Sequence, residues 1–340
     1  MARNGELVAF ETIGDAPDGD ATRYVAFSCT KGVFASAVWA LMSDGELDVA
    51  TPVADLIPEF RTNGKEVVTI DHLLTMTAGF PRAPLGPPRW QTREGRRAAF
   101  AEWRLDWAPG SRCEYHANSA SWVLAEVVGQ VAGRDHRAYL NERVLEPMGV
   151  ALRLGDDGPV AAPVAVGKPP SAEEMEALTG VAGIELPDVQ EEHLLRFADK
   201  EVRALGHPAA GVVGTAADLA LYYQSLLVDR AGVFDPAVLA DVTGTVRTGD
   251  MVDPVRNAVA LRTRGLMLAG DDGAGTRRGF GRKVSARAFG HDGAGGQVAW
   301  ADPESGLSFA YLTNGLDANP VGVARRGVSL SDRAAAFAAT

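Results

Sequence analysis

Cysteine and histidine are both scarce in this sequence. Cys29 and Cys113 are the only cysteines among 340 residues, too few for a disulfide scaffold or a cysteine metal cluster. We expect both to be free thiols, with a disulfide between them as the alternative. The six histidines form no His-Glu-x-x-His motif and no other tight ligand spacing. The sequence therefore predicts no bound metal.

Positive charge and long apolar runs are lacking as well. Lys and Arg number 33 against 44 Asp and Glu, which gives a net charge of -11. Binding to a phosphate backbone needs basic patches, so nucleic acid is excluded as a partner. No apolar run approaches the roughly 18 residues of a spanning helix, and the first six residues lack the pattern of a signal peptide. We expect a cytoplasmic protein with no membrane span.

Two common active-site signatures are missing. No serine lies in Gly-x-Ser-x-Gly, the nucleophile elbow of α/β-hydrolases. The glycine-rich segments 273–275 and 293–296 do not complete the Gly-x-Gly-x-x-Gly pattern of dinucleotide binding. We therefore expect no cofactor.

The order of the expected secondary structure indicates a fold class. A strand is predicted near the start, several helices follow, and short strands separated by tight turns come last. Because both ends are strand-like, we expect both to join one antiparallel sheet. The expected elements are a strand over Glu6–Ile13, helices over Lys31–Ser43, Ile70–Thr77, Ser119–Val131 and Thr215–Val228, and strands over Ala286–His291, Gly296–Ala301 and Leu307–Thr313. Asn4-Gly5 bounds the first strand, Thr69 and Thr215 are the expected helix caps, and Asp218 stands at the capping-box position after Thr215.

This order predicts an α+β fold in which an antiparallel sheet is flanked by helices and carries an inserted, mostly helical domain. The sheet domain is discontinuous and comprises residues 1–48 and 205–340, whereas the inserted domain covers 49–204. Two segments have loop composition: the proline-rich Phe80–Arg89, expected to overhang a site, and an excursion over residues 151–185 with little periodicity.

A single Ser-x-x-Lys pattern, Ser28 with Lys31, stands at the start of the first predicted helix. Residues i and i+3 share a helix face with Cβ atoms about 5–6 Å apart, so the two side chains can exchange a proton. Such a pair can begin nucleophilic chemistry without a distant base. Chance alone would give about 0.2 matches among 13 serines and 5 lysines. Taken alone, the pattern is also that of a capping serine followed by a solvated lysine.

Two further motifs follow in order: Tyr-His-Ala-Asn over residues 115–118 and His-Asp-Gly-Ala over residues 291–294. Together the three resemble the serine β-lactamase-like superfamily of penicillin-recognising hydrolases, which includes class C β-lactamases, D-Ala-D-Ala peptidases and carboxylesterases. The resemblance covers nearly the whole chain and implies a β-lactamase/transpeptidase-like fold. It is greatest to the esterase-type branch, whose second motif often begins Tyr-His and whose third reads His-x-Gly.

The resemblance implies a role for each motif. Ser28 would be the nucleophile, and Lys31 and Tyr115 would carry its proton; which of them is the acylation base stays open. The backbone N–H groups of Ser28 and Ala294 would form the oxyanion hole. Gly293 would let its strand approach the substrate without a Cβ in the way.

The motifs also depart from those of β-lactamases. Ala117 replaces the asparagine that contacts a β-lactam side-chain amide, and Asn118 stands one position later. His291 replaces a lysine, so an imidazole with a pKa of about 6.5 stands in place of a permanent positive charge. Both changes weaken recognition of an anionic β-lactam more than attack on a neutral ester. His116, Asn118 and His291 are expected to contact substrate.

We therefore predict a serine hydrolase that forms an acyl-enzyme on Ser28 and acts on small-molecule esters or amides, most plausibly small carboxylic esters. The alternatives are a β-lactamase or D-Ala-D-Ala carboxypeptidase, and a catalytically inactive binding protein of the same fold. Residues 80–90 and 151–200 are expected to set specificity, because loops on a rigid scaffold usually do.

Overall fold

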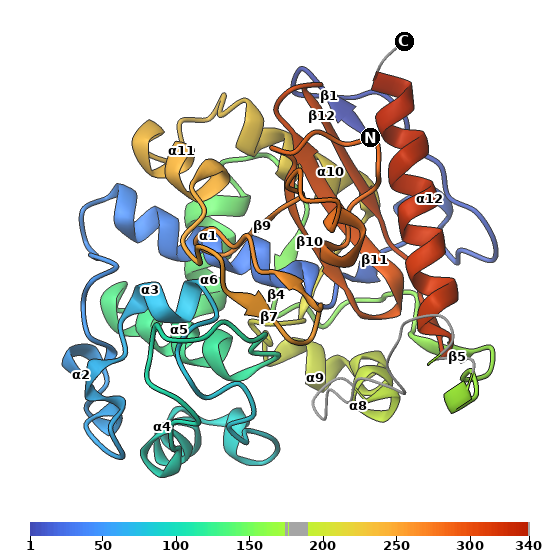
Figure 1. Cartoon of the computed structure of the whole chain (residues 1–340). Coiled ribbons are helices and arrows are strands. Elements are labelled where there is room, and N and C mark those ends of the chain that lie inside the picture. Colours follow the sequence, from blue (N-terminus) through green and yellow to red (C-terminus); the bar gives the residue numbers. More distant parts are fainter. Residues whose placement is uncertain (174–175, 177–189, 339–340) are drawn as a thin grey trace.

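The main sheet joins strands from near both ends of the chain. A computed structural model describes residues 1–173, 176 and 190–338 (Figure 1). Six antiparallel strands lie in the order β2-β1-β12-β11-β10-β9, and Ala2 of β1 pairs with Ser308 of β12. The expectation that both ends join one antiparallel sheet is confirmed. The strands are β1 Ala2–Arg3, β2 Glu6–Leu7, β9 Met267–Leu268, β10 Phe289–Gly293, β11 Gln297–Asp302 and β12 Leu307–Tyr311.

The predicted strand over Glu6–Ile13 is wrong in its extent. Pairing stops at Leu7, and β1 precedes it as the other arm of a hairpin. Asn4 and Gly5 form the turn with positive φ values of 54° and 80°, as a type I′ hairpin requires. Residues 8–13 make no strand pairing, and Ile13 is 83% exposed. The Asn-Gly pair therefore joins two strands, whereas the sequence analysis used it only as a boundary.

Helices cover both faces of this sheet. Successive residues of β12 point to opposite faces: Ser308 Oγ donates to the Ala220 carbonyl of α10 at 2.7 Å, whereas Phe309 shares an apolar cluster with Ala334 of α12. Helix α12, Pro320–Ala338, runs along the outer face (Figure 1). Helix α10, Ala216–Leu227, begins at the predicted Thr215 cap and its capping box with Asp218.

Helix α1, Cys29–Ser43, is buried almost throughout and lies between the sheet and the helical region. It contacts β10 on one side and α5, Ser119–Val131, on the other. One apolar cluster, with members from Ala26 to Leu312, spans both regions. The predictions for α1, α5 and α10 are confirmed to within two residues at each end. The proposed division at residues 49–204 stays a prediction, since a shared core crosses its boundaries.

The remaining elements are short. Helix α3 keeps its predicted Thr69 cap but ends at Leu74, before the predicted Thr77. Two helices were not predicted from the sequence: α4, in which five of the ten residues are charged, and α12. The other helices are α2 Val53–Leu56, α3 Ile70–Leu74, α4 Arg93–Glu102, α6 His136–Leu140, α8 Glu191–Leu195, α9 Lys200–Ala204 and α11 Pro236–Gly244; the other strands are β3 Tyr24–Val25, β4 Arg153–Leu154, β5 Val164–Val166, β6 Val212–Gly214, β7 Val252–Asp253, β8 Ala258–Val259 and β13 Gly315–Asp317.

The predicted excursion over 151–185 carries two short strands. Strand β4 joins a small sheet with β3 and β6, and β5 pairs in parallel with β13. Residues 174–175 and 177–185 of this prediction lie outside the described residues. Within the parts of the chain that the structure describes, no helix is both long and apolar enough to cross a membrane.

Candidate active site

Ser28 stands at the turn that leads into α1. Its side chain makes no capping hydrogen bond, so the interpretation of Ser28 as a capping serine is not supported. The preceding residue, Phe27, has a φ of 43°, a left-handed conformation that costs a bulky residue on the order of 1–3 kcal/mol. Phe27 is 1% exposed and packs edge-on against Phe197 with ring centroids 5.6 Å apart. Packing therefore holds the strained turn that presents the Ser28 hydroxyl.

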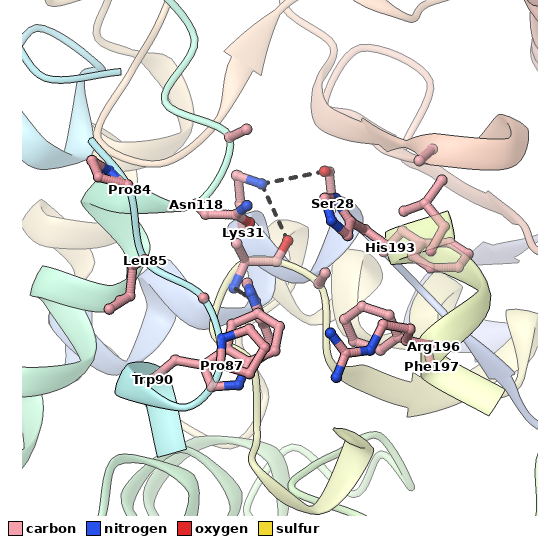
Figure 2. Close-up of a pocket in the computed structure, with 18 residues that line it drawn as sticks. Ser28, Lys31, Pro84, Leu85, Pro87, Trp90, Asn118, His193, Arg196 and Phe197 are labelled. Atoms are coloured by element: carbon pink, nitrogen blue, oxygen red, sulfur yellow. Dashed lines mark hydrogen bonds between the residues drawn. The ribbon is translucent and has the colours of Figure 1, made fainter. Parts of the chain in front are cut away.

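Lys31 and Tyr115 converge on that hydroxyl. Tyr115 donates its O–H to Ser28 Oγ at 2.9 Å, and Lys31 Nζ donates to the same oxygen at 3.2 Å. A second donor of Lys31 goes to the Ala209 carbonyl at 3.2 Å, and Nζ lies 4.9 Å from the centroid of the Tyr115 ring. Figure 2 shows the ammonium group directed at Ser28. Lys31 is 5% exposed and is thus not a solvated lysine.

Strand β10 brings the third motif against the start of α1. A Cβ on Gly293 would lie 2.8 Å from the carbonyl oxygen of Ala26, so only glycine allows this approach. The Cys29 thiol donates to the His291 carbonyl at 3.2 Å and ties the two segments together. Ala294, directly after the strand, lines the same cavity as Ser28. The structure therefore brings Gly293 and Ala294 to the nucleophile.

His291 lies beside Tyr115 but carries no charge at neutral pH. Its ring centroid is 6.0 Å from that of Tyr115, and it is 2% exposed. Burial lowers its pKa to about 3, with Lys31 lowering it further and Asp292 opposing the effect. Nδ1 lies 2.6 Å from the Asp292 carbonyl oxygen, which assigns the ring proton to Nδ1. Nε2 is buried with no partner among the described residues.

Of the two remaining predicted contacts, the structure brings one to the cavity. Asn118 lines it, with its side chain free of any capping bond. His116 is fully buried: its Nε2 accepts the Phe80 N–H at 3.2 Å, and Nδ1 lies 2.7 Å from the Glu114 carbonyl. His116 therefore anchors the start of the overhanging loop rather than facing the cavity.

Three buried histidines, His116, His207 and His291, have pKa values well below the usual 6.5. Burial is the main cause in each, and it lowers the pKa of His116 to about 4 and those of the other two to about 3. All three are therefore neutral near pH 7. For all three histidines, the contribution to the free energy of unfolding changes with pH in the same direction.

The cavity beside Ser28 has a volume of about 250 Å³. The loop predicted to overhang a site forms one wall, and the end of α8 with the following turn forms the facing wall. Both segments were predicted from the sequence to lie near the site. Their individual lining residues were not, because neither segment contains a motif. The wall residues are Pro84, Leu85, Gly86, Pro87 and Trp90 on one side and His193, Leu194, Arg196 and Phe197 on the other.

A buried ion pair lies beside the ring of Tyr115. Arg262 and Asp253 are 2% and 1% exposed, and Nη2 of Arg262 lies 3.5 Å from Oδ2 of Asp253. The guanidinium carbon lies 5.6 Å from the centroid of the Tyr115 ring. Nothing in the sequence signals this contact, since an arginine near the β7–β8 hairpin meets a tyrosine in a distant segment.

Both cysteines are free and buried, which confirms the expectation of thiols. Burial raises the pKa of the Cys113 thiol to about 11 and that of Cys29 well above its usual value. Both groups are therefore protonated at neutral pH, so neither is a nucleophile.

The chain is similar to known proteins along most of its length. Residues 1–332 match the beta-lactamase family. The chain is 31% identical to the esterase EstB of Burkholderia gladioli, over 92% of the chain and 84% of that protein, and 28% identical to the esterase/beta-lactamase LipL of Mycobacterium tuberculosis, over 86% and 69%. A penicillin-binding protein homologue from Caulobacter crescentus superposes with a TM-score of 0.74 at 26% identity, covering 100% of this chain and 91% of that chain. The chain therefore belongs to the beta-lactamase family of serine hydrolases.

Proposed function

We propose that the protein is a carboxylesterase that cleaves small esters through an acyl-enzyme on Ser28. The observation that carries this proposal is the convergence of two proton carriers, Lys31 and Tyr115, on the Ser28 hydroxyl at 3.2 and 2.9 Å. A nucleophile within hydrogen-bond reach of its base is the arrangement that covalent catalysis requires.

The reaction runs in two steps. Ser28 Oγ attacks the ester carbonyl carbon while its proton passes to Lys31 or Tyr115, whichever of the two is deprotonated in the reacting state; both lie within hydrogen-bond reach of Oγ. The N–H groups of Ser28 and Ala294 stabilise the oxyanion; one such donor is typically worth about 100- to 1000-fold in rate. The proton returns to the alcohol oxygen as the C–O bond breaks. Water then hydrolyses the acyl-enzyme, which releases the acid and restores the Ser28 hydroxyl.

The third motif supports an ester rather than a β-lactam substrate. His291 is neutral, and its Nδ1 faces the Asp292 carbonyl, so it offers no cation to the carboxylate of a β-lactam. Asp292 itself forms an ion pair with Arg256 at 2.5 Å, so the Arg256 guanidinium is not free to bind the carboxylate of a β-lactam. The relatives EstB and LipL, named as an esterase and an esterase/beta-lactamase, support the same proposal.

The proposed domains would meet at this site. Ser28 and Ala294 belong to the sheet domain, residues 1–48 and 205–340, and Tyr115 to the helical insertion, 49–204. In this proposal the insertion supplies Tyr115 and both cavity walls, while the sheet domain supplies the nucleophile, Lys31 and the oxyanion hole.

Turnover of p-nitrophenyl butyrate and of a chromogenic cephalosporin tests the proposal. We expect ester cleavage that is lost in Ser28→Ala and retained in Ser43→Ala, a matched control at the far end of the same helix. Efficient cephalosporin hydrolysis with negligible ester cleavage would favour a β-lactamase instead. A fluorophosphonate probe followed by intact mass should add one adduct to the wild type and none to Ser28→Ala; an unmodified wild type would favour a non-catalytic binding protein.

A further inference from the structure

The cavity beside Ser28 is cationic in a chain of net charge -11. No aspartate or glutamate is among its lining residues in the described part of the chain, whereas Lys31 and Arg196 both are. Lys31 already hydrogen-bonds to Ser28 Oγ and the Ala209 carbonyl, and its Nζ contacts the Tyr115 ring. Arg196 is thus the cation available to a ligand.

The guanidinium of Arg196 has no hydrogen bond or ion pair with any described residue. It makes a cation–π contact with the facing wall, where the guanidinium carbon lies 5.9 Å from the centroid of the Trp90 ring. Figure 2 shows the guanidinium directed across the cavity toward that wall. Trp90 adds a second unused donor, since its indole N–H is buried without an acceptor in the described structure. This end of the cavity therefore offers donors, and no described carboxylate lines it.

The position of Arg196 is fixed relative to the nucleophile. The next residue, Phe197, is 5% exposed and packs edge-on against Phe27, the residue before Ser28. Phe197 also contacts the ring of His207 with centroids 5.9 Å apart. A half-buried arginine anchored in this way is a built element of the cavity rather than a freely solvated side chain.

The walls between Ser28 and Arg196 are apolar. Pro84, Leu85 and Pro87 stand on one side and Leu194 and Phe197 on the other. Such walls favour a hydrocarbon segment, because its burial removes apolar surface from water. An arginine fork at the far end favours a carboxylate, which supplies only acceptors and can bind both prongs.

We propose that the cavity selects esters in which an apolar segment separates the scissile carbonyl from a terminal carboxylate, and that Arg196 binds this carboxylate. The assignment rests on the proposed esterase function and adds a substrate class to it. It agrees with the neutral third motif, because a carboxylate bound by Arg196 needs no cation at His291.

Two p-nitrophenyl esters of matched length test the assignment: the hydrogen adipate, which ends in a carboxylate, and its methyl ester, which is neutral. We expect the wild type to prefer the anionic ester at least about 10-fold in kcat/KM, since a hydrogen bond to a charged group contributes on this scale. Arg196→Gln should abolish the preference through KM, so that the two esters are cleaved with similar kcat/KM. Arg287→Gln, at an exposed site outside the cavity, is the matched control and should keep the preference.

A binding measurement separates this assignment from the proposed function. Monomethyl adipate should bind Ser28→Ala by calorimetry, and adding Arg196→Gln should weaken its Kd about 10-fold whether or not the wild type hydrolyses esters. Equal kcat/KM for the two esters, or equal binding with and without Arg196, would overturn the carboxylate site and leave the esterase intact. Absence of all ester cleavage with Arg196-dependent binding would overturn the esterase alone.

Discussion

The buried ion pair of Arg262 and Asp253 should affect both the stability of the fold and the activity. Two variants can separate these two effects. Arg262→Met removes the positive charge but keeps most of the side-chain volume. It leaves the Asp253 carboxylate, which is 1% exposed, without its ion-pair partner. Adding Asp253→Asn removes the stranded charge while keeping an oxygen to accept the Val255 N–H, now at 3.0 Å from Oδ1.

The geometry sets the size of the effect. Two unit charges 3.5 Å apart attract by about 5 kcal/mol at an effective dielectric constant of about 20. Breaking a buried pair by removing one partner costs about 3–5 kcal/mol, and the remaining Val255 N–H bond places Arg262→Met near the lower end. The double variant should regain about 2 kcal/mol, because no buried charge is left without a partner.

Activity should follow a different order. Both variants lose the cation beside the Tyr115 ring, 5.6 Å away in the wild type, and a cation–π contact contributes about 0.5–2 kcal/mol. We therefore expect kcat to fall about 2- to 30-fold in both variants, although only the single variant is strongly destabilised.

Urea unfolding followed by circular dichroism, with ester turnover on the same samples, measures both effects. Arg282→Met is the matched control, since its side chain is 75% exposed and its loss should change the free energy of unfolding by less than about 0.5 kcal/mol. A single variant within about 1 kcal/mol of wild type, or a double variant no more stable than the single, would refute the reasoning.

Three further predictions concern the site. Tyr115→Phe should lower kcat for a short ester by about 100-fold or more with little change in KM, as loss of a proton carrier does; an unchanged kcat would remove Tyr115 from the mechanism. Gly293→Ala places a Cβ 2.8 Å from the Ala26 carbonyl and should lower both kcat and Tm, whereas Gly244→Ala, with open space at its Cβ, should lower neither. The three buried histidines have folded pKa values of about 3 to 4, below the unfolded value of about 6.5. The unfolded state therefore takes up their protons first as the pH falls. The free energy of unfolding should then drop below pH 6.5 by up to about 1.4 kcal/mol per pH unit for each histidine; urea midpoints at pH 7, 6 and 5 measure this, and His291→Gln should make the slope shallower.

The parts of the fold that were predictable are those that local chemistry determines. The period of apolar residues and the capping box at Thr215 and Asp218 located α10, and the i, i+3 spacing located Ser28 and Lys31 before any tertiary contact was known. Helix α12 was not predicted, because only one stripe of it is apolar, around Ala334, and its partner β12 lies elsewhere in the chain.

The site residues that were not predictable act through contacts between distant segments. Arg196 and Arg262 have ordinary sequence surroundings, and their roles come from Trp90 and Tyr115, which lie far from them in sequence. His116 shows the opposite case: the motif placed it beside Tyr115, but one side chain bonds Ser28 and the next bonds the Phe80 amide. A motif gives the neighbours along the chain, whereas the fold decides the direction in which each side chain points.

The pairing of Ala2 with Ser308 has a consequence for folding kinetics. The Cys29 thiol meets the His291 carbonyl across 262 positions, so the start of α1 and the third motif come together only through contacts of very long sequence separation. Such contacts form slowly because the intervening chain must first be ordered. During refolding, recovery of ester cleavage should therefore trail recovery of helical circular dichroism, and a nascent chain on the ribosome should stay inactive until β10 to β12 have emerged.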